Sequence, residues 1–142
     1  MMEYRKNVAG ILFDGKNILI VTKPNLGFWQ FVQGGVENNE NIRKSLKREI
    51  REETGIKEFD IIKELKNHHK WDWNPKLQKL RGFRGQKQAF FLVKLIPNKK
   101  IKLQKEELED FKWILPEDLE KFTKYPPKVI NEILNEIKNL RV

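Results

Sequence analysis

Three glutamates lie within the short run "KREIREETG", residues 47–55. Glu49, Glu52 and Glu53 stand out because the chain is basic, with 29 Lys and Arg against 20 Asp and Glu. Carboxylates on neighbouring turns of a helix repel each other. Two roles would explain them: a solvated helix face with Arg–Glu pairs, or a divalent-cation site, because Mg²⁺ and Mn²⁺ prefer hard carboxylate oxygens.

The spacing of the surrounding residues favours the cation site. Residues 41–54 have a helical pattern, and Gly55 follows where a left-handed glycine commonly ends a helix. At about 100° per residue, Glu49 and Glu53 fall at the edge of the apolar face and Glu52 flanks them. The opposite face carries basic residues: Lys44, Lys47 and Arg51. Carboxylates at a partly buried edge destabilise the fold unless a cation binds them.

Composition excludes several classes of protein. The chain of 142 residues has no cysteine, which removes disulfides, Cys-ligated zinc and cysteine nucleophiles. With 39% apolar and 11% aromatic residues, we expect one folded domain over residues 1–142. No signal peptide or membrane-length apolar run is apparent, so we expect a cytoplasmic protein with no membrane partner. The net charge of +9 suits a polyanionic partner such as a nucleotide or nucleic acid.

The remaining chain predicts strands and helices that are mixed without a regular βαβ alternation. We expect a hairpin over 7–23, an aromatic strand over 27–33, a loop after it, and further strands over 59–65, 88–96 and 110–115. A short helix is expected over 116–122 and a longer one over 126–140. Residues 66–85 are expected to form a long polar and aromatic loop. Together these elements predict an α/β (α+β) fold, a mixed sheet with a helix on each face.

The region from Gly34 resembles the Nudix box. Gly34 is followed by five residues and Glu40, then seven residues and "REIREETGI", residues 48–56. Segments "EYRKNVAGILF", "FWQFVQGG" and "GQKQAFFLVKL" also resemble the Nudix subgroup of dinucleoside polyphosphate hydrolases and RNA pyrophosphohydrolases. Asn39 stands where many members have glycine, and Asn tolerates the left-handed conformation better than most residues.

This resemblance implies a Nudix-type α/β/α sandwich and a metal site. Glu49 and Glu53, with Glu52 directly or through water, would bind Mg²⁺ or Mn²⁺ together with the Gly34 carbonyl. Glu40 and Arg48 would have a structural role, Arg48 orienting the acidic cluster. A further catalytic glutamate is expected from a loop before a late strand. Glu107 is the best match for it, with two rivals nearby: Glu106 and Glu109.

Substrate contacts are also implied by the resemblance. Arg5 and Lys87 match phosphate-binding positions, and Lys23 is a further candidate. Tyr125 matches a base-stacking position, with Phe122 as competitor. His68 and His69 are adjacent and so are poor joint metal ligands. Trp71 and Trp73 either line the site or anchor the loop.

The expected activity is Mg²⁺-assisted hydrolysis of a phosphoanhydride. The catalytic carboxylates would be Glu52, Glu53 and Glu107, one of which takes the proton of the attacking water. The first expected substrate is diadenosine tetraphosphate, cleaved to ATP and AMP. The alternatives are the 5′-triphosphate end of RNA, running over the basic segment 76–87 (Lys79, Arg81 and Arg84), and a noncatalytic nucleotide or RNA sensor.

Overall fold

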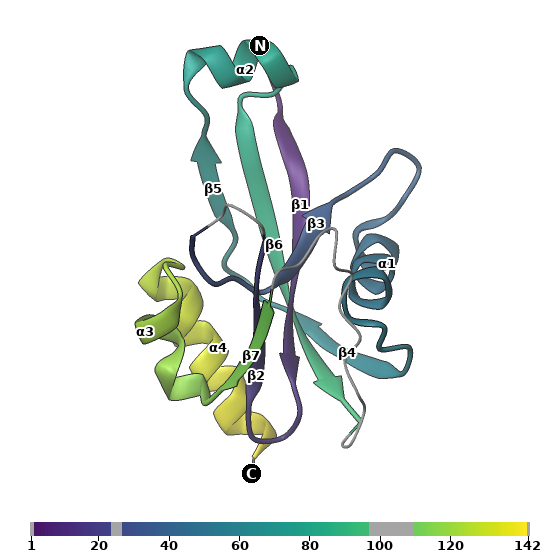
Figure 1. Ribbon diagram of the computed structural model, residues 1–142, viewed down its shortest axis with the longest axis vertical. Coiled ribbons are helices and arrows are strands. Elements are labelled where there is room, and N and C mark those ends of the chain that lie inside the picture. Colours follow the sequence, from purple (N-terminus) through teal and green to yellow (C-terminus); the bar gives the residue numbers. More distant parts are fainter. Residues whose placement is uncertain (1, 24–26, 97–109, 142) are drawn as a thin grey trace.

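The computed structural model describes residues 2–23, 27–96 and 110–141, and its centre is a mixed β-sheet (Figure 1). The order is β4-β6-β1-β2-β7, with β3 paired to β1 and β5 paired to β6. The strands are β1 (Tyr4–Phe13), β2 (Ile18–Thr22), β3 (Val32–Gly35), β4 (Phe59–Glu64), β5 (His69–Asp72), β6 (Gly85–Leu95) and β7 (Asp110–Ile114). The pair β1–β6 is parallel, and all other strand pairs of the described residues are antiparallel.

Helices cover both faces of the sheet, as Figure 1 shows. Helix α1 (Ile42–Thr54) packs on one face, and α3 (Leu119–Phe122) and α4 (Pro127–Leu140) lie on the other. A short 3₁₀ turn, η1 (Pro116–Asp118), precedes α3, and α2 (Pro75–Arg81) lies at one end of the sheet. The predicted three-layer α/β architecture is therefore confirmed. None of the helices described is long and apolar enough to cross a bilayer.

Strand alternation divides the core into two clusters. Residues of β1 point in turn to α1 and to α4, because successive side chains of a strand face opposite ways. Val8 and Leu12 belong to the cluster under α1, which also holds Leu46 and Ile50 of that helix. The cluster under α4 holds Ala9, Ile11 and Phe13 of β1, with four apolar positions of α4: Val129, Ile130, Ile133 and Ile137. We call these two sides the α1 face and the α4 face.

The chain from Gly27 to Gly35 differs from its prediction. Within 27–31 only Gln30 makes a strand-like contact, an isolated bridge to Val21. Strand β3 begins at Val32 and includes Gly34 and Gly35, which the sequence assigned to a loop. The reason is a long-range contact: antiparallel pairing with β1 gives these residues backbone hydrogen-bond partners. Two successive glycines alone would instead predict a loop.

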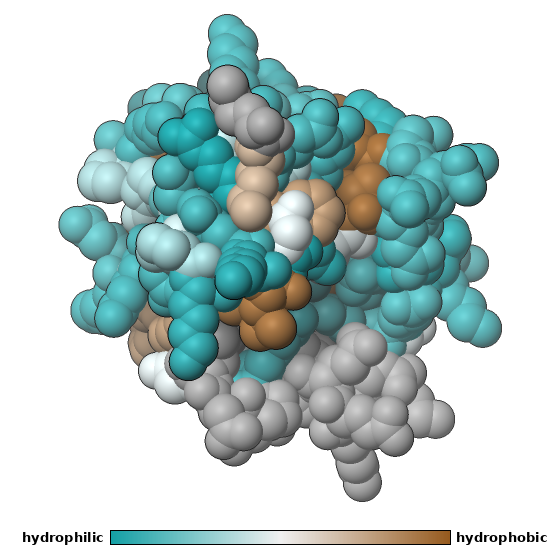
Figure 2. All heavy atoms as spheres, turned by 90° about the horizontal axis from the view of Figure 1, so that it is seen from above, coloured by the Kyte–Doolittle hydropathy of each residue, from teal (hydrophilic) through white to brown (hydrophobic). Residues whose placement is uncertain are grey.

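The predicted long loop over 66–85 is wrong. It contains β5, an edge strand paired to β6, and α2. Helix α2 is delimited by ordinary signals: the Asn74 side chain accepts a hydrogen bond from Leu77 N–H at 2.9 Å, Pro75 occupies the first turn, and Gly82 ends the helix with φ 77°. Seen from the α2 end, the surface is mostly hydrophilic with a few small apolar patches (Figure 2).

Candidate active site

Helix α1 presents its glutamates as the sequence predicts. Asn41 caps its first turn by accepting from Lys44 N–H at 2.9 Å, and Gly55 ends it with φ 74°. Glu49 is 8% exposed and Glu53 is 1% exposed, whereas Glu52 lies at the surface. Two carboxylates are therefore held in the boundary between the helix and the sheet, where an anion needs a cationic partner.

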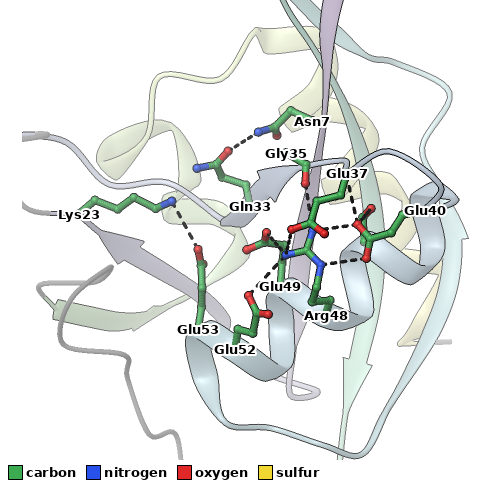
Figure 3. A network of polar contacts seen from close by, with 11 residues as sticks. Asn7, Lys23, Gln33, Gly35, Glu37, Glu40, Arg48, Glu49, Glu52 and Glu53 are labelled. Atoms are coloured by element: carbon green, nitrogen blue, oxygen red, sulfur yellow. Dashed lines mark hydrogen bonds and ion pairs between the residues drawn. The ribbon is translucent and has the colours of Figure 1, made fainter.

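Arg48 is the main such partner (Figure 3). Its guanidinium donates from Nε and Nη2 to both oxygens of Glu40, each at 2.9 Å. It also donates from Nη1 to Glu49 at 2.8 Å and to Glu52 at 3.4 Å, and from Nη2 to the Gly35 carbonyl at 3.2 Å. Arg48 thus ties α1 to the loop after β3. The predicted structural pairing of Glu40 and Arg48 is present in the geometry.

The same contacts shift two pKa values. The hydrogen bonds from Arg48, followed by one from the Ser45 hydroxyl, lower the pKa of Glu40 to about 2. Glu40 in turn raises the pKa of Arg48. Asn39, in the turn before Glu40, has φ 71°, so the left-handed conformation predicted there for an asparagine is confirmed.

Two successive glycines of β3 give room to two functional side chains. A Cβ on Gly34 would lie 2.1 Å from the Glu49 carboxyl carbon, and a Cβ on Gly35 would lie 2.1 Å from Nη2 of Arg5. Arg5 also donates to Gln86 at 3.2 Å. Because the two glycines alternate along β3, Glu49 approaches from the α1 face and Arg5 from the α4 face.

Lys23 holds the remaining carboxylate. Its Nζ lies 3.4 Å from Oε1 of Glu53, and the Lys23 side chain is 30% exposed (Figure 3). Since Arg48 engages Glu49 and Glu52 while Lys23 engages Glu53, the described residues contain no three-ligand acidic or histidine cluster converged on one point.

The donor set nevertheless fits a divalent cation. Three carboxylates from adjacent positions of one helix are hard oxygen ligands. The ammonium group of Lys23 shows that a cation is accommodated beside the buried Glu53 carboxylate. The side chains that would bind Mg²⁺ are those predicted, Glu49, Glu52 and Glu53, together with the Gly34 carbonyl.

A cavity of about 510 Å³ opens on the α4 face next to Gly34. Its polar residues include three glutamines that lie on strands, Gln33 of β3 and Gln86 and Gln88 of β6, and the other polar lining residues are Gln30, His69, Arg81 and Lys124. Buried Asn7 links two of them, since it donates to Gln33 at 2.6 Å and accepts from Gln88 at 2.7 Å. Aromatic side chains line the rest: Phe28, Trp29, Trp71, Trp73 and Tyr125. Aromatic faces with amide donors and acceptors suit a nucleobase.

Tyr125 reaches this cavity but is also part of the core. Its ring stacks on Phe31 with centroids 4.5 Å apart, and its hydroxyl accepts from Phe31 N–H at 2.9 Å. Burial raises the pKa of the Tyr125 hydroxyl. One face of the ring is therefore used by the protein, and stacking on a base stays a prediction. Its competitor Phe122 lies 4.7 Å from Lys112 Nζ, measured to the ring centroid.

The structure does not bring Lys87 together with Arg5. Lys87 is exposed and lies between Gln86 and Gln88 on β6, so it points to the opposite face of the sheet. It is aligned with Lys70 on β5 instead. Its contact with phosphate stays a prediction. The three candidates for the extra glutamate, Glu106, Glu107 and Glu109, lie outside the described residues.

Sequence reasoning missed the amide side of the cavity. Gln86 and Gln88 occupy alternate positions of β6, and the next two residues on that face, Phe90 and Leu92, are apolar core residues. Two glutamines next to apolar residues on one strand face indicate a polar function. Asn7 and Gln33 contact this pair only because β1 pairs with both β3 and β6. Trp71 and Trp73, left undecided by the sequence, line the cavity, and Arg81 lies over the Trp73 ring at 5.0 Å.

Known proteins match this sequence over most of its length. The NUDIX domain model matches residues 3–133. The chain belongs to the Nudix family. It is 35% identical to an RNA pyrophosphohydrolase of a Nitratiruptor species, over 82% of this chain and 81% of that protein. It is 34% identical to Nudix hydrolase 25 of Arabidopsis thaliana, over 82% of this chain and 75% of the relative.

Solved Nudix structures agree at the level of the fold. The C. elegans Ap4A hydrolase superposes with a TM-score of 0.76 over 95% of this chain and 98% of that chain, at 19% identity. With the family shown, this Nudix protein is an enzyme, a hydrolase acting on phosphoanhydride bonds of nucleotides.

Proposed function

We propose that this Nudix hydrolase removes pyrophosphate from the 5′-triphosphate end of RNA, with Mg²⁺ as cofactor and Mn²⁺ as a possible substitute. The observation that carries the proposal is the continuity of the site. Gln33, which lines the aromatic cavity, is followed directly by Gly34, which faces Glu49. A nucleoside in the cavity would place its phosphates beside Arg5 and the glutamates of α1. The cytoplasmic location predicted from the sequence belongs to the same proposal.

The order of substrates follows the relatives. The sequence placed diadenosine tetraphosphate first and RNA second. Several relatives at 30–35% identity are named RNA pyrophosphohydrolase. The likeness to an Ap4A hydrolase has 19% identity and supports only the fold. Dinucleoside tetraphosphate is kept as the second candidate because several aromatic side chains line the cavity and could stack on two bases: Trp29, Trp71, Trp73 and Tyr125. A noncatalytic sensor has no observation in its favour.

Different residues would bind the metal ion, bind the phosphates and accept the proton. Glu49, Glu52, Glu53 and the Gly34 carbonyl would hold Mg²⁺, which when bound neutralises phosphate charge and acidifies water. Arg5, lying against Gly35, donates hydrogen bonds to the phosphate chain and stabilises the charge that develops during hydrolysis. A carboxylate takes the proton of the water whose oxygen attacks phosphorus. The exposure of Glu52 supports it for this role, and Glu53 and Glu107 are the other predicted candidates.

A product assay tests the proposal. Triphosphorylated RNA and diadenosine tetraphosphate are offered separately at equal concentration with Mg²⁺, and pyrophosphate, orthophosphate, ATP and AMP are quantified. We expect pyrophosphate and 5′-monophosphorylated RNA as the products with the higher kcat/KM. Faster release of ATP and AMP from the dinucleotide would reverse the order, and Glu53→Gln is the control that must lose both activities.

A further inference from the structure

A second hollow, about 440 Å³ in volume, lies beside the cavity and is strongly basic. We call it the basic depression. Its lining is Lys66, Asn67, His68, His69, Lys70, Lys87 and Lys128. It lies along the edge strand β5 and takes one residue, Lys128, from α4. None of these residues belongs to the metal-binding carboxylates or to their partners.

The lysines of the basic depression form no close ion pairs within the described part of the protein, although Lys70 lies over the Tyr4 ring at 5.0 Å. Among the described residues, none of its four lysines has a carboxylate within 4.0 Å. The nearby Glu132 is already engaged: it accepts from the backbone N–H groups of Lys66 and Asn67 at 2.6 and 2.9 Å. Lys70 and Lys87 are directly opposite each other on β5 and β6. Like charges in that relation destabilise a sheet, so an anion between them would be favoured.

His69 connects the basic depression to the cavity, because it lines both. Its ring lies 4.7 Å from the Trp71 ring, which forms part of the cavity wall. Burial and the charge of Lys128 lower the pKa of His69, so the ring at this boundary is neutral at neutral pH. An occupant that leaves the aromatic walls past His69 meets Lys128 of α4, and at the edge strand β5 it reaches Lys70 and Lys87, which point to the other face of the sheet.

Distance separates the basic depression from the reacting phosphates. The sheet runs from β5 through β6 and β1 to β3, where Gly34 faces Glu49. Three strand spacings of about 4.8 Å each put the depression about 14 Å from the carboxylates. The phosphates of one nucleotide, held at the carboxylates, do not extend to it. A longer polyanion that begins at the carboxylates and fills the cavity with its first base does.

From this arrangement we infer that the basic depression binds the backbone of RNA downstream of the 5′ nucleotide, with the chain crossing His69. The inference rests on the proposed function. It differs from the sequence-based expectation, which had the RNA running over the basic segment 76–87. In that segment Arg81 lies over Trp73, and Arg84 pairs with Asp72 at 3.1 Å. Lys87 then contacts a downstream phosphate instead of the cleaved one.

The test measures binding separately from cleavage. Fluorescence anisotropy without divalent metal gives the affinity of 5′-triphosphorylated RNAs from two to about eight nucleotides long, at several salt concentrations. The variant is Lys66→Gln with Lys128→Gln. The matched control is Lys76→Gln with Lys79→Gln, two exposed lysines of α2 outside the basic depression. Circular dichroism and thermal melting confirm that both variants fold.

We expect affinity for wild-type protein to rise with RNA length, and the Lys66/Lys128 variant to lose about tenfold for the longer RNAs only. Its slope of log K against log salt should fall by about 1.4, because each phosphate contact on a single strand contributes about 0.7. Hydrolysis of diadenosine tetraphosphate should be unchanged. Affinity independent of length, or an equal loss in the α2 control, would overturn the inference. Length-dependent binding without RNA cleavage would instead reject the proposed function and keep the binding surface.

Discussion

Gly34 and Glu49 are in such close contact that no side chain fits between them: a Cβ on Gly34 would lie 2.1 Å from the Glu49 carboxyl carbon. The next residue, Gly35, has the same relation to the guanidinium of Arg5. These two contacts allow the proposed metal-binding role of Glu49 and the proposed phosphate-binding role of Arg5 to be disturbed separately.

Gly34→Ala should therefore lower kcat by about 100-fold, because it displaces a carboxylate that acts on the transition state. Gly35→Ala should mainly raise KM, because it displaces Arg5 from the substrate phosphates. Each displaced group is the end of a flexible side chain, so unfolding free energies should fall by at most about 1–3 kcal/mol. Steady-state kinetics and urea denaturation measure both effects. Identical kinetic defects in the two variants would contradict the separation.

Lys23→Gln should lower the Mg²⁺ concentration needed for half-maximal activity. The Lys23 ammonium lies 3.4 Å from Glu53 and competes with a metal ion for the same carboxylate. Glu53→Gln should instead reduce turnover by about 100-fold or more at any Mg²⁺ concentration. Activity is titrated with Mg²⁺ in both variants. A higher Mg²⁺ requirement in Lys23→Gln, or a KM effect alone, would make Lys23 a substrate contact as the sequence predicts.

Tyr125→Phe should destabilise the protein. The substitution leaves Phe31 N–H without its acceptor at 2.9 Å, which costs about 1–3 kcal/mol for a buried donor. Tyr125→Ala should cost about 3–5 kcal/mol, because the ring also packs on Phe31. Urea denaturation gives both values. If Tyr125→Phe is as stable as the wild type while KM rises, the hydroxyl serves the substrate and not the fold.

Glu132 should contribute to stability in a pH-dependent way. Burial works against its charge, but hydrogen bonds from the backbone N–H groups of Lys66 and Asn67 and from the Asn67 side chain lower its pKa below 4.5. The contribution is complete above the unfolded value of 4.5 and is lost as pH falls through the lower folded value.

The variant Glu132→Gln should lose about 1–2 kcal/mol near pH 7 and show a flatter decline of stability below pH 4.5. Glu120→Gln, an exposed residue of α3, controls for the loss of one negative charge. Denaturant unfolding at several pH values measures both variants. The same acid-side decline in Glu132→Gln and wild type would show that other groups cause it.

Helix α1 and its carboxylates could be predicted because their signals are local. The apolar period, Gly55 and the Nudix box spacing all lie within residues 34–56. The left-handed conformation of Asn39 is also explained locally, because asparagine stands where many Nudix proteins have glycine. The hairpin of β1 and β2 follows from a turn-forming cluster between two apolar runs.

The cavity could not be predicted because its residues meet through long-range pairing. Gln88 and Gln33 come together with Asn7 only when β1 pairs with both β6 and β3. Lys87 points away from Arg5 because neighbouring residues of a strand face opposite sides of the sheet. The sequence alone does not show which residues of β6 face α1 and which face α4. The strand β5 was not predicted because its extended conformation depends on hydrogen bonds to β6, and not on a local sequence pattern.

The glycine pair of β3 also sets the thickness of the protein at one point. Sheets are normally covered by side chains on both faces, which keeps the two faces about 10 Å from their neighbouring layers. At Gly34 and Gly35 neither face has a side chain of its own, and Glu49 and Arg5 approach the bare backbone from opposite sides. A polyphosphate whose base lies on the α4 face can therefore reach the carboxylates of the α1 face past a backbone that carries no side chains.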